Sequence, residues 1–170
     1  MSDEIINRVA KSPLVTLDLE SLYPKNQRIQ LDIADWLHEG LILREKEFRQ
    51  QLKEHDWTQY KDTFVALHCS TDAIVPGWTY ILITTFLQPY AKMVVKGDLY
   101  MLDQMLYAEI IEKLDVTPYQ DQKVIIKGCS KIKVPDNAFL LITQKLMPVV
   151  SSLMFGEACS TVPLYKKSKS

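Results

Sequence analysis

DWTQYKDTFVALHC at residues 56–69 and DVTPYQDQKVIIKGC at residues 115–129 decide the fold, because the second stretch repeats the first. The pattern Asp-x-Thr-x-Tyr-x-Asp starts at residue 56 and again at residue 115, an offset of 59. After a one-residue gap, the cysteine that ends each stretch also aligns. Shared order of this kind indicates an internal repeat, which must be recognised before single elements are assigned.

The match continues on both sides of these stretches. YILITTFLQP at 80–89 aligns with FLLITQKLMP at 139–148, and Gly97 aligns with Gly156. Upstream, Leu43 aligns with Leu102. The sequence therefore predicts two copies of one unit, at 41–99 and 100–158.

Each copy predicts the order helix, strand, helix, strand. LREKEFRQQLKEH at 43–55 and LDQMLYAEIIEKL at 102–114 have apolar residues at helical spacing. TFVALHC at 63–69 and KVIIKGC at 123–129 are short apolar, β-branched runs typical of buried strands. The stretches that start at Pro76 and Pro135 are rich in β-branched residues. Their apolar positions 80, 83 and 87 nevertheless favour helices to Leu87 and Leu146. KMVVKG at 92–97 and SLMFGE at 152–157 close the units as strands.

Residues 1–40 add two further segments, LVTLDLES and RIQLDIADW, whose alternating pattern predicts strands. A turn signal, YPKNQ, separates them, and we expect antiparallel strands at the edge of the sheet. The expected architecture is α/β with a mostly parallel sheet. A chain of 170 residues is long enough for one compact domain, and we expect residues 1–170 to form a single domain with internal pseudo-symmetry.

The three cysteines suggest where function could lie. Cys69, Cys129 and Cys159 each follow an expected strand, and loops after parallel strands gather at the edge where α/β sheets bind ligands. Thiolates bind zinc, iron or copper(I), and a fourth ligand could be His68, Asp72, Glu157 or water. The sequence thus suggests a metal site of Cys69, Cys129, Cys159 and His68, with zinc or iron as the cofactor.

Three alternatives to this metal site stay open. The same cysteines could act as nucleophilic thiols, since Lys127 and Lys131 flank Cys129. They could also be small buried apolar residues. In the third alternative, the chain is a non-catalytic protein-interaction or regulatory module. Its tail at 159–170 would then dock on a neighbouring subunit of a homodimer or close over its own domain.

Composition excludes several classes of function. A net charge of −1 gives no electrostatic footprint for nucleic acid. The longest apolar stretches, such as YILITTFL, are too short to span a bilayer, so no membrane partner is expected. The start MSDEIINRVAKS lacks the pattern of a signal peptide, and the cysteine count is odd. These features favour free thiols in a reducing cytoplasm.

Four stretches of the sequence resemble those of a known family: HDW at 55–57, KGCSK at 127–131, VPDNAF at 134–139 and FGEACSTVPLYKK at 155–167. The chain resembles an uncharacterised bacterial family, the domain of unknown function 2480, over its whole length. The resemblance implies no activity, cofactor or catalytic residue, so the functional hypotheses rest on the residues themselves.

Overall fold

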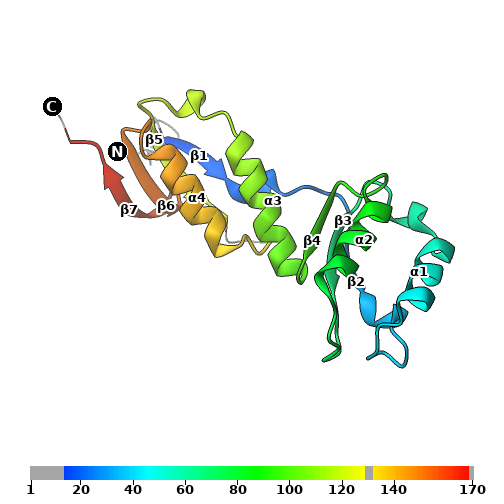
Figure 1. The fold of residues 1–170 in the computed structure, drawn as a ribbon. Coiled ribbons are helices and arrows are strands. Elements are labelled where there is room, and N and C mark those ends of the chain that lie inside the picture. Colours follow the sequence, from blue (N-terminus) through cyan, green and yellow to red (C-terminus); the bar gives the residue numbers. More distant parts are fainter. Residues whose placement is uncertain (1–13, 129–131, 169–170) are drawn as a thin grey trace, which may run out of the picture. The chain divides into compact units, whose positions relative to one another are not determined.

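The computed structural model describes residues 14–128 and 132–168 (Figure 1). The chain divides into two compact units. Unit 2 is the continuous segment Pro24–Met105, and unit 1 combines the chain up to Tyr23 with the chain from Leu106 onward. Each unit has its own sheet and its own core.

Unit 2 contains a three-stranded parallel sheet in the order β2-β3-β4. The strands are β2 (Arg28–Asp32), β3 (Phe64–His68) and β4 (Met93–Lys96). The central strand β3 is buried up to its last residue, which explains its uninterrupted apolar sequence FVAL.

The helices of unit 2 are α1 (Glu45–Glu54) and α2 (Gly77–Leu87), with short 3-10 segments η2 (Ile33–Trp36) and η3 (Trp57–Tyr60). Phe48 and Leu52 of α1 and Ile83 and Leu87 of α2 are fully buried, as the helical spacing predicts. They pack with one face of the sheet in a single cluster, whose buried members are Ile33, Trp36, Phe48, Leu52, Trp57, Tyr60, Val65, Leu67, Ile83 and Leu87.

Unit 1 contains a four-stranded sheet in the order β1-β5-β6-β7. β1 (Leu14–Asp18), β5 (Lys123–Lys127) and β6 (Ser152–Glu157) are parallel, and β7 (Ser160–Lys166) pairs antiparallel with β6. The tail, for which the sequence left two alternatives, therefore closes over its own unit as β7.

In unit 1, α4 (Asp136–Leu146) and the second half of α3 (Leu99–Lys113) lie on one face of the sheet (Figure 1). The short segments η1 (Leu19–Leu22) and η4 (Thr117–Tyr119) complete the unit. The buried core consists of Leu17, Leu19, Tyr107, Ile111, Val124, Ile126, Val134, Ala138, Ile142, Leu146, Val150 and Leu153.

The two helices expected after Pro76 and Pro135 are confirmed as α2 and α4. Each proline is the extended residue immediately before the helix, where its missing N–H costs no hydrogen bond. Within α2, Thr84 Oγ1 donates to the Tyr80 carbonyl at 2.8 Å, so this hydroxyl is satisfied inside the helix. Helical spacing therefore outweighs β-propensity in both segments.

Elements of the two units correspond at the offset seen in the sequence. β3 starts at 64 and β5 at 123, and α2 covers 77–87 where α4 covers 136–146. The edge strands also match, because β1 and β2 each end in an aspartate that caps a 3-10 segment. That this correspondence arose by internal duplication stays a prediction.

Two expectations about the sheet were wrong. The strands form two sheets in place of one, because β3 and β4 pair with β2 whereas β5 and β6 pair with β1. β1 and β2 do lie at sheet edges, but they are parallel to their neighbours and belong to different sheets, so YPKNQ is no hairpin turn. A long connection through a helix separates β2 from β3, and such a connection suits parallel pairing.

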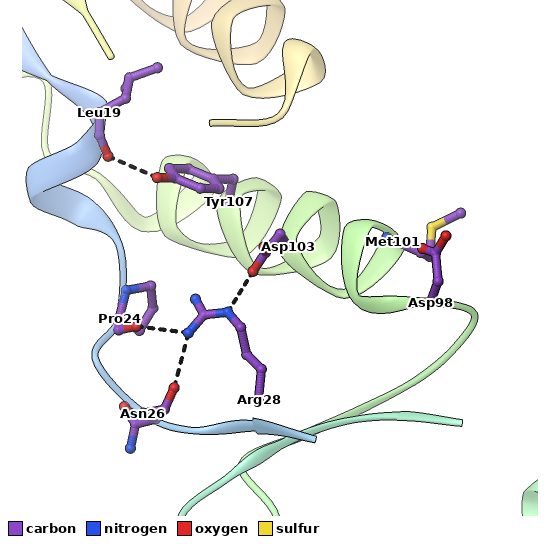
Figure 2. Close-up of polar contacts among 8 residues, drawn as sticks. All are labelled: Leu19, Pro24, Asn26, Arg28, Asp98, Met101, Asp103 and Tyr107. Carbon is purple, nitrogen blue, oxygen red and sulfur yellow. Dashed lines mark hydrogen bonds and ion pairs between the residues drawn. The ribbon is translucent and has the colours of Figure 1, made fainter. Parts of the chain in front are cut away.

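α3 crosses the boundary between the units, since Met105 belongs to unit 2 and Leu106 to unit 1. Within unit 2, its residue Asp103 accepts a hydrogen bond from Arg28 on β2 (Figure 2). Within unit 1, Tyr107 Oη donates to the Leu19 carbonyl, at 3.1 Å. Among the described residues, no helix has the length and apolar character needed to cross a membrane.

Candidate functional site

The carboxyl edge of the β2-β3-β4 sheet holds the first predicted site residues. His68 is the last residue of β3 and Cys69 follows it, and both side chains are half-buried. Cys69 Sγ lies 3.4 Å from Thr71 Oγ1. His68 is the register partner of Asp32 on β2, so these two residues lie side by side at the end of the sheet.

Asp32 is an acceptor for two loops at this edge. Its Oδ1 accepts the Ala34 N–H at 2.9 Å and the Ser70 N–H at 3.1 Å. Burial alone would raise the pKa of Asp32, but the hydrogen bonds from the Ser70 side chain and from both amides, with the charge of His68, lower it. The carboxylate therefore stays ionised and fixes the loop after β3 to the loop after β2.

Tyr80 on α2 faces the same edge. Burial raises the pKa of its phenol, and electrostatic interactions with Cys69 and Asp32 add to this shift. Lys96 Nζ, at the end of β4, lies 4.4 Å from the centroid of the Tyr80 ring, in cation–π geometry. Polar side chains from all three strands and from α2 thus meet at this edge, as expected for an open α/β sheet.

The corresponding edge of unit 1 carries an ion pair. Lys127, the last residue of β5, lies 3.0 Å from Glu157, the last residue of β6. The hydrogen bond and the charge of Glu157 raise the pKa of Lys127, with smaller contributions from Asp18 and Glu20. Glu157, a candidate fourth metal ligand, is therefore held as the partner of a lysine.

The structure does not assemble the predicted metal site from the residues it describes. Cys69 lies in unit 2, whereas Cys159 is an exposed residue in the two-residue turn between β6 and β7 of unit 1. Cys129 lies outside the described residues. Within the described ranges, no three His, Cys, Asp or Glu side chains are grouped closely enough to hold a metal ion. His68 and Cys69 are together only as neighbours in sequence.

A second feature of unit 2 was not predicted. A shallow hollow of about 430 Å³ lies between residues 41–43 and the loop 72–76. Ile74 is 92% exposed, and Leu41 and Ile42 are more than half exposed. We call the surface formed by Leu41, Ile42 and Ile74 the apolar hollow.

Hydrogen bonds hold both walls of the apolar hollow in place. Thr71 Oγ1 donates to the Gly40 carbonyl at 2.6 Å, which ties the loop after β3 to the turn at 38–42. That turn is closed by a bridge, in which His38 and Ile42 exchange backbone hydrogen bonds of 2.8 and 3.0 Å. The hollow is therefore built by the fold and does not require a partner to form.

Comparison with family models gives one result. Residues 3–167 match the model described as "Protein of unknown function (DUF2480)", so the chain belongs to this family. Neither the curated proteins nor the solved structures contain a significant match.

Proposed function

We propose that this member of the DUF2480 family is a non-catalytic, cytoplasmic protein-interaction module that binds its partner at the apolar hollow. The observation that carries the proposal is the exposure of Ile74, at 92%, next to Leu41 at 54% and Ile42 at 53%. Soluble proteins rarely leave large apolar side chains gathered around one depression unless another molecule covers them.

The lining of the hollow indicates the chemistry of the partner. It is apolar except for Asp72, whose side chain is exposed at the rim. A partner segment that inserts an aliphatic or aromatic side chain and carries a lysine or arginine beside it would match both features. The surface is also preorganised by the Thr71–Gly40 hydrogen bond, which lowers the entropic cost of binding.

The first test uses a photo-crosslinking amino acid at position 74 of the full chain, in cells of the source organism. We expect one protein to be crosslinked from position 74 and not from position 92, an exposed lysine of the same unit. The purified pair is then compared with the Ile74→Asp variant, for which we expect affinity to fall by about tenfold or more. Equal affinity of Ile74→Asp would refute the proposal.

The predicted homodimer is a competing occupant of the same surface. Sedimentation of the purified chain separates the two ideas, because a dimer that Ile74→Asp converts to a monomer would assign the hollow to a second copy. Folding is not expected to confound either experiment, since Ile74 is almost fully exposed and its replacement removes little packing.

A cysteine site is a second proposal, and one observation favours it: Cys69 and Cys159 both follow the carboxyl end of a strand. Zinc or iron bound by Cys69, Cys159 and His68 would need Cys129, because the described residues alone form no group of ligands. Elemental analysis of anaerobically purified protein tests this. About one equivalent of metal that Cys129→Ser removes would support the site, and metal-free protein would refute it.

A further inference from the structure

We propose that unit 1 binds a small organic anion with an apolar body at the amino-terminal edge of its sheet. A hollow of about 600 Å³ lies there, within the size range of ligand sites. It is distinct from the apolar hollow of unit 2 and from the carboxyl edges that carry the cysteines.

Strand register places two lysines on the same face of this sheet. Ser152 on β6 pairs with Lys123 on β5 and with Lys166 on β7, so the three side chains form one row. Neighbouring strands lie about 4.8 Å apart, which puts the two lysine Cα atoms roughly 10 Å apart. Both long side chains can therefore reach one anionic group above Ser152.

The next row of the sheet supplies an apolar surface. Met154 pairs with Pro163 across β6 and β7, and both line the hollow. Leu14, the register partner of Lys123 on β1, lines it on the other side. A ligand could thus place its charge between the lysines and its apolar body on Met154 and Pro163.

The two lysines are available for a ligand. The ion pair formed near this edge by described residues joins Lys167 to Asp121, at 3.7 Å. Within the part of the chain that the structure describes, neither Lys123 nor Lys166 forms an ion pair. Two cations beside an apolar floor favour an aryl or alkyl phosphate or carboxylate, because the charged and apolar parts are both satisfied.

In the test, small-molecule probes are titrated into the isotope-labelled full chain, and NMR monitors the shifts of its amide signals. The probes are phenyl phosphate, phenol and inorganic phosphate, which separate the contribution of the charge from that of the apolar body. We expect phenyl phosphate to shift the signals of Lys123, Ser152 and Lys166 saturably, with about tenfold weaker binding of either partial probe.

Two double variants complete the test. Lys123→Gln with Lys166→Gln should weaken phenyl phosphate binding about tenfold, whereas Lys61→Gln with Lys92→Gln, on exposed sites of unit 2, should not. Equal binding by both double variants would overturn the proposal. The proposal would also be overturned if none of the three probes shifted the amide signals at this edge. That result is expected if another part of the chain fills the hollow.

Discussion

Asp62 and Asp121 adopt the same left-handed backbone conformation, with φ of 59° and 56°. Each lies just before an interior strand, β3 in unit 2 and β5 in unit 1, and each donates its N–H to the segment after the following helix. Asp62 donates to the Tyr90 carbonyl at 3.0 Å, and Asp121 to the Val149 carbonyl at 2.7 Å. In each unit, this turn therefore ties the start of the strand to the segment that follows the next helix.

The first prediction follows from this conformation. Left-handed φ values cost ordinary residues about 1–2 kcal/mol, and β-branched residues are the least tolerant of them. Asp62→Val should therefore lower the free energy of unfolding by about 1–2 kcal/mol, and Asp62→Gly should change it by less than about 0.5 kcal/mol. Urea denaturation of both variants, and of the same pair at Asp121, measures this. Equal losses for valine and glycine would show that the carboxylate matters and the backbone does not.

The ion pair between Arg28 and Asp103 gives the second prediction. Arg28 Nε lies 2.6 Å from Asp103 Oδ1, and their side chains are only 11% and 18% exposed. Arg28 also donates to the carbonyls of Pro24 and Asn26 (Figure 2). Removing one charge from a largely buried pair leaves the other poorly compensated, so Asp103→Asn should destabilise the protein by about 2–4 kcal/mol.

Chemical denaturation tests the Arg28–Asp103 prediction, with Asp72→Asn as the matched control at an exposed site. The control should change stability by less than about 0.5 kcal/mol. A loss for Asp103→Asn no larger than that of the control would show that the pair contributes nothing to the attachment of α3 within unit 2.

Much of the local structure could be predicted from the sequence, because each unit shows the same pattern with different residues. The positions of β3, β5, α2 and α4 followed from apolar spacing shared by both segments. The repeated Asp-x-Thr pattern at Asp56 and Asp115 also has a local meaning, because each aspartate accepts hydrogen bonds from the N–H and hydroxyl of the threonine two residues later. Local hydrogen bonding of this kind depends on near neighbours, which a sequence displays directly.

Strand pairing could not be predicted in the same way. A buried apolar strand indicates that both faces are covered, but it does not specify its neighbour. The missed signal was the repeated Leu-Asp-apolar motif at Leu17-Asp18 and Leu31-Asp32, where each aspartate caps a 3-10 segment. That motif would have indicated that β1 and β2 hold equivalent places, one in each unit.

The apolar hollow was missed for a different physical reason. Leu41, Ile42 and Ile74 look like core residues in a sequence, because apolar character does not show whether a side chain is covered. The cysteines drew attention because they are few. Asp32 organises the carboxyl edge of the β2-β3-β4 sheet through the amides of Ala34 and Ser70, and the sequence analysis did not single it out.

A third prediction concerns Gly156 in the β6–β7 hairpin. Its φ is +116°, and a Cβ added there would lie 2.7 Å from the Ser160 carbonyl oxygen, so the backbone of the hairpin would have to move. Gly156→Ala should cost about 2–3 kcal/mol. Gly77→Ala at the start of α2 meets nothing within 4 Å and should be neutral or slightly stabilising. Thermal denaturation compares the two, and similar effects would contradict the assignment of strain to Gly156.

The last prediction concerns pH and His55, whose ring packs among aromatic residues of unit 2. Its centroid lies 4.7 Å from that of Trp57 and 5.1 Å from that of Trp36, and its Nε2 is 2.9 Å from Tyr60 Oη. Burial lowers the pKa of His55 below its ordinary value of 6.5, although the charge of Asp56 partly opposes the shift. Folding therefore favours the neutral ring over the charged one.

The unfolded chain protonates His55 more readily than the folded protein does. The contribution of His55 to the free energy of unfolding is therefore fully present above pH 6.5, and it declines as the pH falls through the lower pKa of the folded state. We expect the wild type to lose free energy of unfolding between about pH 8 and about pH 5. His55→Phe, which keeps an aromatic ring but cannot titrate, should lose less over the same range. Tyr60→Phe removes the hydroxyl partner but leaves the imidazole, so it should retain the wild-type direction of the pH dependence. Urea denaturation at both pH values measures all three proteins, and an equal loss for wild type and His55→Phe would show that His55 does not contribute to acid sensitivity.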